Sequence, residues 1–535
     1  MQSPGLGRRL FTHKWLLLAG VLIVIIIFGG LWISFHFSPI LQRRAAEALS
    51  DRFDSEVEIR DFHASLLDLK IYGGGLVVRY HGRHDVPPLI SVDKFSGEAS
   101  LAGLIRQPLH ISSVRVEGLA IQVPPHRNGE SGKKDVDEPS DDDGGMPDPQ
   151  SPASRLIIDE LICSQAQLIT LPGQPGKDPK VWDIHDLMMR GLGLGHAATF
   201  HATLTNGVPP GEIHTDGDFG PWARQDPATT PVKGEYEFRD ADLSVFRGIS
   251  GILSSNGKYD GPLNDLHVNG RTDIPDFSVS IAGHKVHLTT QFDATVDGSN
   301  GDTLLHPVIA QFLKSSLTAN GGVIKIKANK GKAIDLDIAL DNGRLEDLMA
   351  LGVKGKPPMT GTISLKTKFK LPSGKGEDTE IIDRLMLDGQ FGIQQGQFAE
   401  MKIQEKVKSL SRHGLGKPTD EDAGSAVSQL RGKFLLRNAV ITFHDLTFGV
   451  AGATVALHGS YGLRTEDLDF HGKLRLDAKL SQMTTGFKSI LLKPFDPFFR
   501  KNGVTELPIK ITGKRDHPSF GLDFGHKDTQ QEAKK

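Results

Sequence analysis

Histidine is the residue type that most suggests chemistry, because the chain contains 21 of them. An imidazole can bind a metal or transfer a proton near neutral pH. The histidines are scattered, however, and no His-Glu-x-x-His sequence would place two of them on one face of a helix. The single cysteine, Cys163, excludes a cysteine-rich zinc site. We therefore expect structural or surface roles for the histidines, and neither a metal site nor a cofactor.

Sequences that would mark a nucleophile or a phosphate-binding loop are missing as well. Gly248-Ile249-Ser250-Gly251 comes near the Gly-x-Ser-x-Gly elbow but lacks its spacing. The stretch GILSSNGKY, residues 251–259, has one residue too many between its glycines for a phosphate loop. The run GLGLG at 191–195 is not surrounded by a βαβ pattern, and acidic pairs such as Glu346-Asp347 are common in a charged chain. The sequence therefore predicts no catalytic residue and no enzyme.

The most prominent element is an apolar stretch near the N-terminus, WLLLAGVLIVIIIFGGLWISF, residues 15–35. A helix of this length spans about 31 Å, which matches the roughly 30 Å hydrocarbon core of a bilayer. The stretch is too long for the apolar core of a signal peptide, and no small-x-small cleavage site follows it. It predicts a retained transmembrane helix. The alternatives are a buried helix of a soluble domain and a cleaved signal.

The remaining composition indicates where the chain lies. Positive charges on the two sides of residues 15–35 balance, but only 14 residues precede the stretch and 500 follow it, and long domains translocate largely regardless of charge. We expect a cytoplasmic tail at 1–14 and the rest outside. A large exported chain with one cysteine suits a bacterial periplasm. The net charge of −3 gives no case for nucleic acid. The prediction is a single-pass protein of the bacterial inner membrane.

Two further regions follow the anchor. Region 36–125 begins at Ser38-Pro39 with an amphipathic helix on the membrane surface and continues as strands, with a break at Gly73–Gly75. The apolar side of this helix is expected to consist of Ile40, Leu41, Ala45, Leu49 and Phe53. Region 126–154 holds eight acidic residues and almost no apolar ones, so it cannot bury enough surface to fold. It predicts a disordered linker, since the ligand spacing of a calcium-binding EF-hand is absent.

The rest of the chain alternates apolar and polar residues over many short segments, in a central region 155–384 and a C-terminal region 385–527, before a polar tail at 528–535. Such alternation is typical of antiparallel strands with one apolar and one wet face. We expect short helices near 305–314, 345–351 and 403–412. The predicted fold class is therefore mainly β, with few helices.

Two ends of the chain together resemble the AsmA-like family of bacterial inner-membrane proteins. At the front these are LQRRAAEALSDRFDSEVEIRDFHASLLDLKI and LISVDKFSGEASLAGLIRQPLHISSVRVEGLAIQV. At the back they are LMLDGQFGIQQGQFAEMKIQEKVKSLS, FLLRNAVITFHDLTFGVAGATVALHGSYGLRTEDLDFHGKLRL and LPIKITGKRDHPSFGLDF. The acidic insert at 126–154 departs from the family and leaves open whether the first sheet continues into the second. The resemblance implies an elongated, curved β-sheet groove in the periplasm, related to bridge-like lipid transfer proteins. It also implies that the protein moves phospholipid between membranes, with the inner membrane, phospholipid and outer-membrane or periplasmic proteins as partners.

The apolar side of the predicted strands is the candidate lipid-binding surface. Its predicted groove-facing residues are Val286, Leu288, Phe292, Leu336, Ile338, Leu365, Phe369, Phe470, Leu474 and Leu476. Alternation equally describes the closed core of a β-sandwich, and the apolar stretch 487–499 could touch a membrane, plug the groove or pack under the sheet. Two other functions stay open: a membrane-anchored scaffold or assembly factor for outer-membrane proteins without lipid cargo, and, more distantly, a glycan-processing enzyme.

Overall fold

The computed structural model describes most of the chain beyond residue 37. The described residues are 38–51, 53, 55–65, 68–80, 87–106, 108–123, 156–170, 180–193, 195–223, 226–280, 282–298, 301–325, 332–373, 380–422, 427–483 and 496–523. Among these, no helix is long and apolar enough to cross a membrane. The helix predicted at 15–35, the linker predicted at 126–154 and the tail at 528–535 lie outside the described residues.

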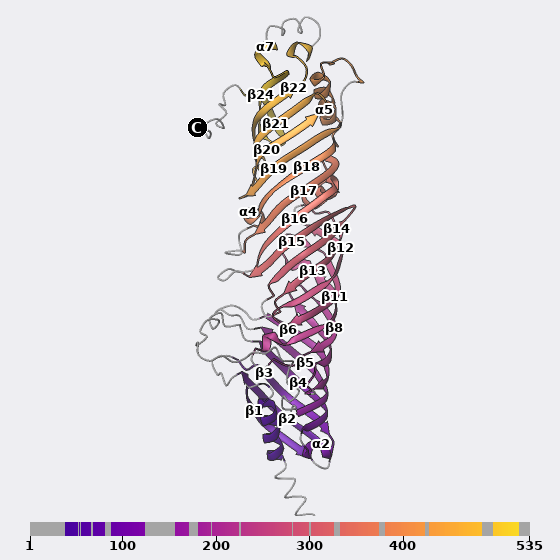
Figure 1. Ribbon diagram of the computed structural model, residues 1–535, viewed down its shortest axis with the longest axis vertical. Helices are drawn as coiled ribbons and strands as arrows, with labels where there is room; N and C mark the ends of the chain where they lie inside the picture. Colours follow the sequence, from indigo (N-terminus) through magenta and orange to yellow (C-terminus); the bar gives the residue numbers. More distant parts are fainter. Residues whose placement is uncertain are drawn as a thin grey trace, which may run out of the picture. The chain divides into compact units, whose positions relative to one another are not determined.

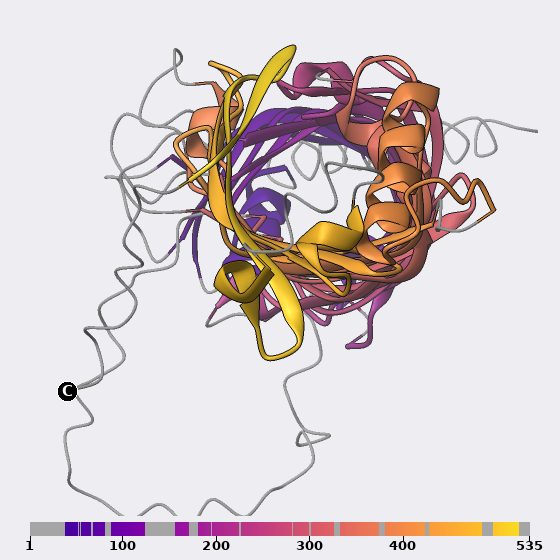
Figure 2. The ribbon, with the colours of Figure 1, turned by 90° about the horizontal axis from the view of Figure 1, so that it is seen from above.

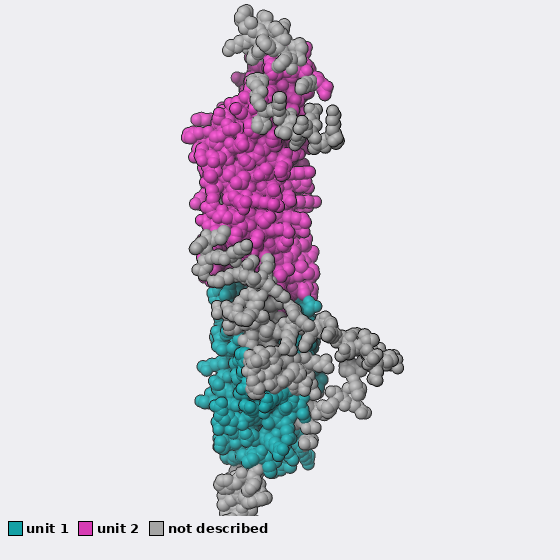
Figure 3. Space-filling model, turned by 90° about the vertical axis from the view of Figure 1, so that its left-hand side faces the viewer, with its two compact units in different colours: residues 1–238, 258–266 teal, residues 239–257, 267–535 magenta. Residues whose placement is uncertain are grey.

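The described chain is mainly β, as predicted, and divides into two compact units (Figure 3). Unit 1 comprises residues 1–238 and 258–266, and unit 2 comprises residues 239–257 and 267–535. The boundary predicted at 384/385 falls inside unit 2, between strands that pair with each other.

Unit 1 contains a sheet in which consecutive strands pair. Its strands are β1 (Ser55–Ser65), β2 (Lys70–Tyr80), β3 (Ile90–Ala99), β4 (Leu109–Val123), β5 (Leu156–Thr170), β6 (Lys180–Leu192), β7 (Ala198–Gly207) and β8 (Pro210–Phe219), with helices α2 (Leu101–Ile105) and η1 (Pro227–Thr229). All of these pairs are antiparallel except β4–β5, which is parallel. Parallel neighbours need a long crossover connection. The acidic insert lies in this connection, so the sheet of unit 1 continues from β4 to β5 on either side of it.

The predicted amphipathic helix forms at residues 38–51 and lies along β1. The Ser38 hydroxyl accepts a hydrogen bond from the backbone N–H of Ala64 (3.0 Å), and the Gln42 side-chain amide donates to the carbonyl oxygen of Ile59 (2.8 Å). Leu41 is buried in the core of unit 1, whereas Ile40 is 55 % exposed. The helix thus covers a strand edge that would otherwise be open to pairing with another chain.

The break predicted at Gly73–Gly75 was wrong, because β2 runs through all three glycines. A Cβ atom at Gly73 would collide with the carbonyl oxygen of Asp61, and one at Gly74 with that of Asp93. Glycine is therefore used here for close approach of neighbouring strands rather than for ending one.

Unit 2 repeats this architecture over more strands. β9 (Pro231–Asp242), β11 (Ile252–Pro262) and β12 (Leu266–Val279) contribute residues to both units. The further strands of unit 2 are β10 (Ile249–Ser250), β13 (Val286–Val296), β14 (Thr303–Phe312), β15 (Ser315–Lys325), β16 (Lys332–Arg344), β17 (Met359–Leu371), β18 (Met386–Phe398), β19 (Ser428–Arg437), β20 (Val440–Val450), β21 (Ala453–Gly462), β22 (Asp467–Leu476), β23 (Arg500–Lys501), β24 (Val504–Lys514) and β25 (His517–Leu522). Its helices are η2 (Leu243–Val245), α3 (Leu345–Gly352), α4 (Ile381–Arg384), α5 (Met401–Gly414), η3 (Leu480–Met483) and α7 (Asp496–Phe499).

From β13 to β22 every strand pairs antiparallel with the next, and β24 and β25 continue the sheet (Figure 1). Seen along its length, the orange-to-yellow part of this sheet curves rather than lying flat (Figure 2). The helices predicted near 345–351 and 403–412 are confirmed as α3 and α5. The helix predicted at 305–314 was wrong: this stretch belongs to β14, whose two neighbours supply partners for its backbone.

Because the strands alternate in direction, the sheet of unit 2 has two edges formed by strand ends and turns. The first edge is where β16 ends and β17 begins, and it carries α3, α5 and η3. The second edge is where β17 ends and β18 begins, and it carries α4. A core cluster of Val286, Phe312, Leu340, Met359, Ile363 and Ile393 lies along the first edge, together with Leu345 of α3.

The attachment of α3 to the first edge is also polar. The buried carboxylate of Asp347 accepts hydrogen bonds from the backbone N–H of Lys314 (3.0 Å) and from the hydroxyl of Ser315 (2.8 Å). The Ser315 hydroxyl in turn accepts a bond from the backbone N–H of Arg344 (2.8 Å). A buried carboxylate is tolerated because its oxygen is satisfied in this way.

Candidate functional site

The candidate site is one face of the sheet of unit 2, on which apolar side chains continue from strand to strand. Residues directly opposite each other on neighbouring strands share a face. One row of such residues crosses from β16 to β22, and it consists of Leu336, Phe369, Leu387, Leu436, Ile441, Tyr461 and Leu468. A second row reaches β25, and it consists of Leu340, Leu365, Phe391, Gly432, Leu446, Leu457, Gly472, Ile509 and Leu522. We call the surface formed by these two rows and the residues alternating with them on the same side the apolar face.

All ten residues predicted from the sequence lie on this face. The register places Leu336, Ile338, Leu365 and Phe369 in direct or neighbouring pairs on β16 and β17. Phe470, Leu474 and Leu476 lie on β22, and Val286 and Leu288 on β13. The ring of Phe292 comes within 3.1 Å of the position that a Cβ of Gly270 would occupy on the same side of β12.

Burial divides these ten residues into two groups. Val286, Phe470 and Leu476 are at most 7 % exposed, whereas the other seven are only partly buried. In a closed sandwich core a second layer would bury the whole face. Here α3 contacts β16 and β17, and α5 contacts β18, β20 and β21, so the helices cover the part of the face near the first edge. Among the described residues of unit 2, no second sheet covers the remainder.

Sequence reasoning found Phe470 but missed Phe391, Phe434 and Phe443, which continue a run of phenylalanines on the apolar face from β18 to β22. The ring centroids of Phe391 and Phe434 lie 6.1 Å apart, those of Phe391 and Phe443 6.4 Å, and those of Phe443 and Phe470 5.9 Å. Aromatic rings at these separations interact favourably with each other, in addition to the free energy gained by burying their apolar surface. The alternation around Phe443 gave the signal that could have found them, but the sequence does not reveal which strands become neighbours.

Glycines lie opposite several of these rings. Gly432 pairs with Phe391 and Gly459 with Phe470. A Cβ at Gly432 would come within 3.2 Å of the Phe391 ring, and at Gly459 it would collide with the carbonyl oxygen of Asp469. The missing side chains therefore leave room for the rings on this face and for close approach of the neighbouring strands.

The opposite, polar face carries ion pairs between neighbouring strands. Lys370 Nζ lies 2.8 Å from Asp335 Oδ2, and Lys368 Nζ lies 4.0 Å from Asp337 Oδ1. The hydrogen bond to Asp335 raises the pKa of Lys370. Such exposed pairs add little stability, but they keep this face in water and leave the apolar face as the side available to an apolar ligand.

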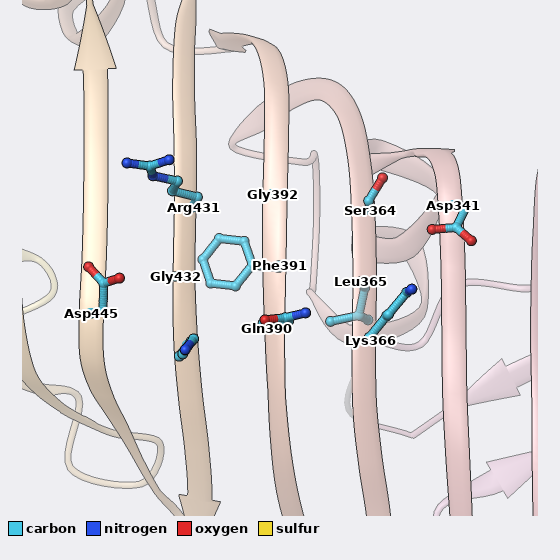
Figure 4. A pocket seen from close by; sticks show the side chains of 11 residues that line it. Asp341, Ser364, Leu365, Lys366, Gln390, Phe391, Gly392, Arg431, Gly432 and Asp445 are labelled. Carbon is cyan, nitrogen blue, oxygen red and sulfur yellow. The ribbon is translucent and has the colours of Figure 1, made fainter.

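A shallow depression of about 300 Å³ lies across β16–β20, lined mainly by polar side chains (Figure 4). Lys366, Arg431 and Lys433 border it together with Asp341 and Asp445, so charges of both signs meet there. The small residues Ser364 and Gly392 leave the space open.

Several histidines of the described residues lie beside a carboxylate of a neighbouring strand. Examples are His110 with Asp159 (2.7 Å) and His201 with Asp216 (2.6 Å). Among the described residues, no group of three or more His, Cys, Asp or Glu side chains is arranged to hold a metal ion.

With this geometry known, the chain can be compared with other proteins. No known protein family, curated protein or solved structure matches it.

The apolar stretch 487–499 is described only in part. Asp496–Phe499 forms α7, and the Asp496 carboxylate accepts hydrogen bonds from the backbone N–H (2.9 Å) and the hydroxyl (2.7 Å) of Ser481 in η3. These bonds lower the pKa of Asp496 against the opposing effect of burial, which is the largest single influence on it. Residues 484–495 lie outside the described part, so the role expected for this stretch stays a prediction.

Proposed function

We propose that the apolar face of unit 2 binds the acyl chains of phospholipids and conducts them along the sheet. In this proposal the protein is anchored in the bacterial inner membrane by residues 15–35. Its β-rich body lies in the periplasm as an elongated, AsmA-like groove and contributes to lipid homeostasis and biogenesis of the outer membrane. The protein is not an enzyme in this proposal. The observation that supports it is an apolar face that crosses the sheet strand by strand and stays partly uncovered.

An acyl chain that crosses water without such a surface faces a large free-energy barrier. Moving an acyl chain from a bilayer into water costs about 0.8 kcal/mol for each CH₂ group, or roughly 12 kcal/mol for a chain of about 16 carbons. A continuous apolar path keeps most of that surface out of water at every step. The twelve strands from β13 to β25, without the short β23, would extend about 50 Å at about 4.8 Å per strand. The side chains needed are those that the apolar face already presents, and none of them has to react.

The test replaces three residues of the apolar face with aspartate, at Leu336→Asp, Phe369→Asp and Leu474→Asp. The matched control places the same number of aspartates on exposed positions of the polar face, at Ser364→Asp, Gln390→Asp and Thr454→Asp. Phospholipid that co-purifies with the full chain is then quantified by mass spectrometry, and circular dichroism checks that each variant retains its strands. Lipid around the membrane anchor should be the same in all three proteins.

We expect the apolar-face variant to lose roughly tenfold or more of the lipid bound to the β body, since unpaired charges would have to be desolvated against acyl chains. The control should retain the wild-type amount. A folded apolar-face variant that retains as much lipid as the control would contradict the proposal. That result would favour an anchored scaffold for outer-membrane proteins instead.

A further inference from the structure

The two edges of the sheet of unit 2 meet at helix α4. Gly248 belongs to the first edge, because β10 directly after it pairs with the end of β12 and because the backbone N–H of Ser280 donates to its carbonyl oxygen (2.9 Å). A Cβ atom at Gly248 would lie 3.0 Å from Cδ1 of Ile381 in α4, and α4 belongs to the second edge. The chain at α4 therefore reaches from one edge of the sheet to the other.

A single arginine from another turn of the second edge holds α4. Arg464, between β21 and β22, donates from Nε to Asp383 Oδ1 (3.0 Å) and from Nη2 to Asp383 Oδ2 (2.8 Å). The same Nη2 lies 2.7 Å from Glu380 Oε2. Arg464 is therefore 81 residues from Asp383 and 84 residues from Glu380 in the chain. The β21–β22 turn that carries Arg464 is also bonded to the β19–β20 turn, because the backbone N–H of Leu463 donates to the carbonyl oxygen of Ala439 (2.8 Å).

The ion pair that attaches α4 is exposed to solvent. The side chains of Arg464, Glu380 and Asp383 are 47 %, 68 % and 38 % exposed. Exposed ion pairs are weak and are screened by salt. The helix itself is one turn long and has no side-chain hydrogen bond at its N-terminus. Such a short element depends on its contacts for its position.

We propose that α4 is a latch at the second edge of the apolar face. With the Arg464 ion pair formed, the latch bridges the two edges. With the pair broken, α4 moves away from Gly248 and lets an acyl chain enter or leave from the side. This inference rests on the proposed function, because it assumes that the apolar face binds acyl chains, and it assigns to α4 the rate at which they exchange.

The test measures exchange of cis-parinaric acid, a fluorescent fatty acid, between the detergent-solubilised full chain and phosphatidylcholine vesicles by stopped flow. The variants are Arg464→Ala and the charge swap Arg464→Asp with Asp383→Arg. The matched control is Arg515→Ala, which breaks the ion pair of Arg515 with Glu466 (3.0 Å) at the same edge without touching α4. Equilibrium binding of the same probe is measured in parallel.

We expect Arg464→Ala to speed both uptake and release about two- to five-fold with unchanged affinity. The swap should return the rates toward wild type, Arg515→Ala should have no effect, and high salt should bring wild type close to Arg464→Ala. If the probe binds every protein and Arg464→Ala exchanges it at the wild-type rate, the latch is wrong while the proposed function stands. If the wild-type chain does not bind the probe, both are contradicted.

Discussion

At the scale of single residues, Cys163 shows how the environment decides chemistry. The thiol is 1 % exposed and lies in the core of unit 1, opposite Val116 on one side and Leu187 on the other. Burial raises the pKa of the thiol to about 12. The thiolate is the reactive form of cysteine, so this residue behaves as a small apolar side chain.

We predict that N-ethylmaleimide at about pH 8, below the ordinary cysteine pKa of about 8.5, does not modify Cys163 in the folded protein and modifies it fully in denaturant. Mass spectrometry of the intact chain measures the adduct. The matched control moves the cysteine by one position, with Cys163→Ala and Ser164→Cys, because Ser164 is exposed on the other face of β5. The control should react at once. Rapid modification of Cys163 in the native chain would show that its surroundings open far more often than its burial indicates.

The sequence pattern predicted well which face of the sheet each side chain occupies, because successive side chains of a strand point to opposite faces whatever its neighbouring strands are. All ten candidate residues share the apolar face for this reason. What could not be predicted depends on neighbours distant in sequence. Gly432 opposite Phe391 has a meaning only once β18 and β19 are known to pair. From the sequence alone, Gly73 suggests the end of a strand. Only the structure shows that the carbonyl oxygen of Asp61 on the neighbouring strand occupies the space of a side chain there.

At the scale of elements, strand β25 at the end of the sheet is held partly by a histidine. His471 Nδ1 lies 2.6 Å from Asp523 Oδ2, directly after β25, and Nε2 lies 3.1 Å from Asp469 Oδ1. The bond to Asp523 is the largest influence on the pKa of His471, which it raises against the effect of desolvation. Lys510 on β24 and His458 on β21 face the same imidazole from the neighbouring strands.

We predict that the attachment of β25 weakens as the pH rises. A raised pKa means that the charged imidazole is bound more tightly in the folded chain, so its stabilisation is complete below the unfolded pKa of about 6.5 and is lost as the pH passes through the folded value. Hydrogen-exchange protection factors of β25 amides, corrected for intrinsic rates, should fall across this range. His471→Asn should remove the pH dependence, and His458→Asn should keep it. The same pH profile in His471→Asn would exclude this bond as its source.

Helices show where element prediction depends on more than the local pattern. α3 and α5 were expected, and each has an apolar side that packs on the first edge. The stretch around Leu305 has a comparable content of apolar residues, but β13 and β15 on either side supply hydrogen-bond partners for an extended backbone. Tertiary pairing therefore decided between helix and strand there.

At the scale of the whole molecule, the two units use the same one-sided sheet differently. In unit 1 the helix 38–51 and α2 lie over the sheet, and the cluster around Leu41, Leu104 and Val116 is fully buried. In unit 2 the cluster around Leu340 and Ile363 lies along the first edge, whereas Leu336 and Phe369, farther from that edge, stay partly exposed. Alternation is the same in both, so the sequence could not separate a closed core from an uncovered face.

The most direct test of the proposed lipid path asks what touches the apolar face in living cells. The photo-crosslinking residue p-benzoylphenylalanine is introduced at Phe369 in the full chain, and in a control at Lys368, the next residue, which points to the polar face. After illumination, the purified chain is analysed by mass spectrometry for phospholipid adducts. We predict an adduct at Phe369 and none at Lys368. Equal labelling at the two positions, or no lipid at Phe369, would contradict a lipid path along the apolar face.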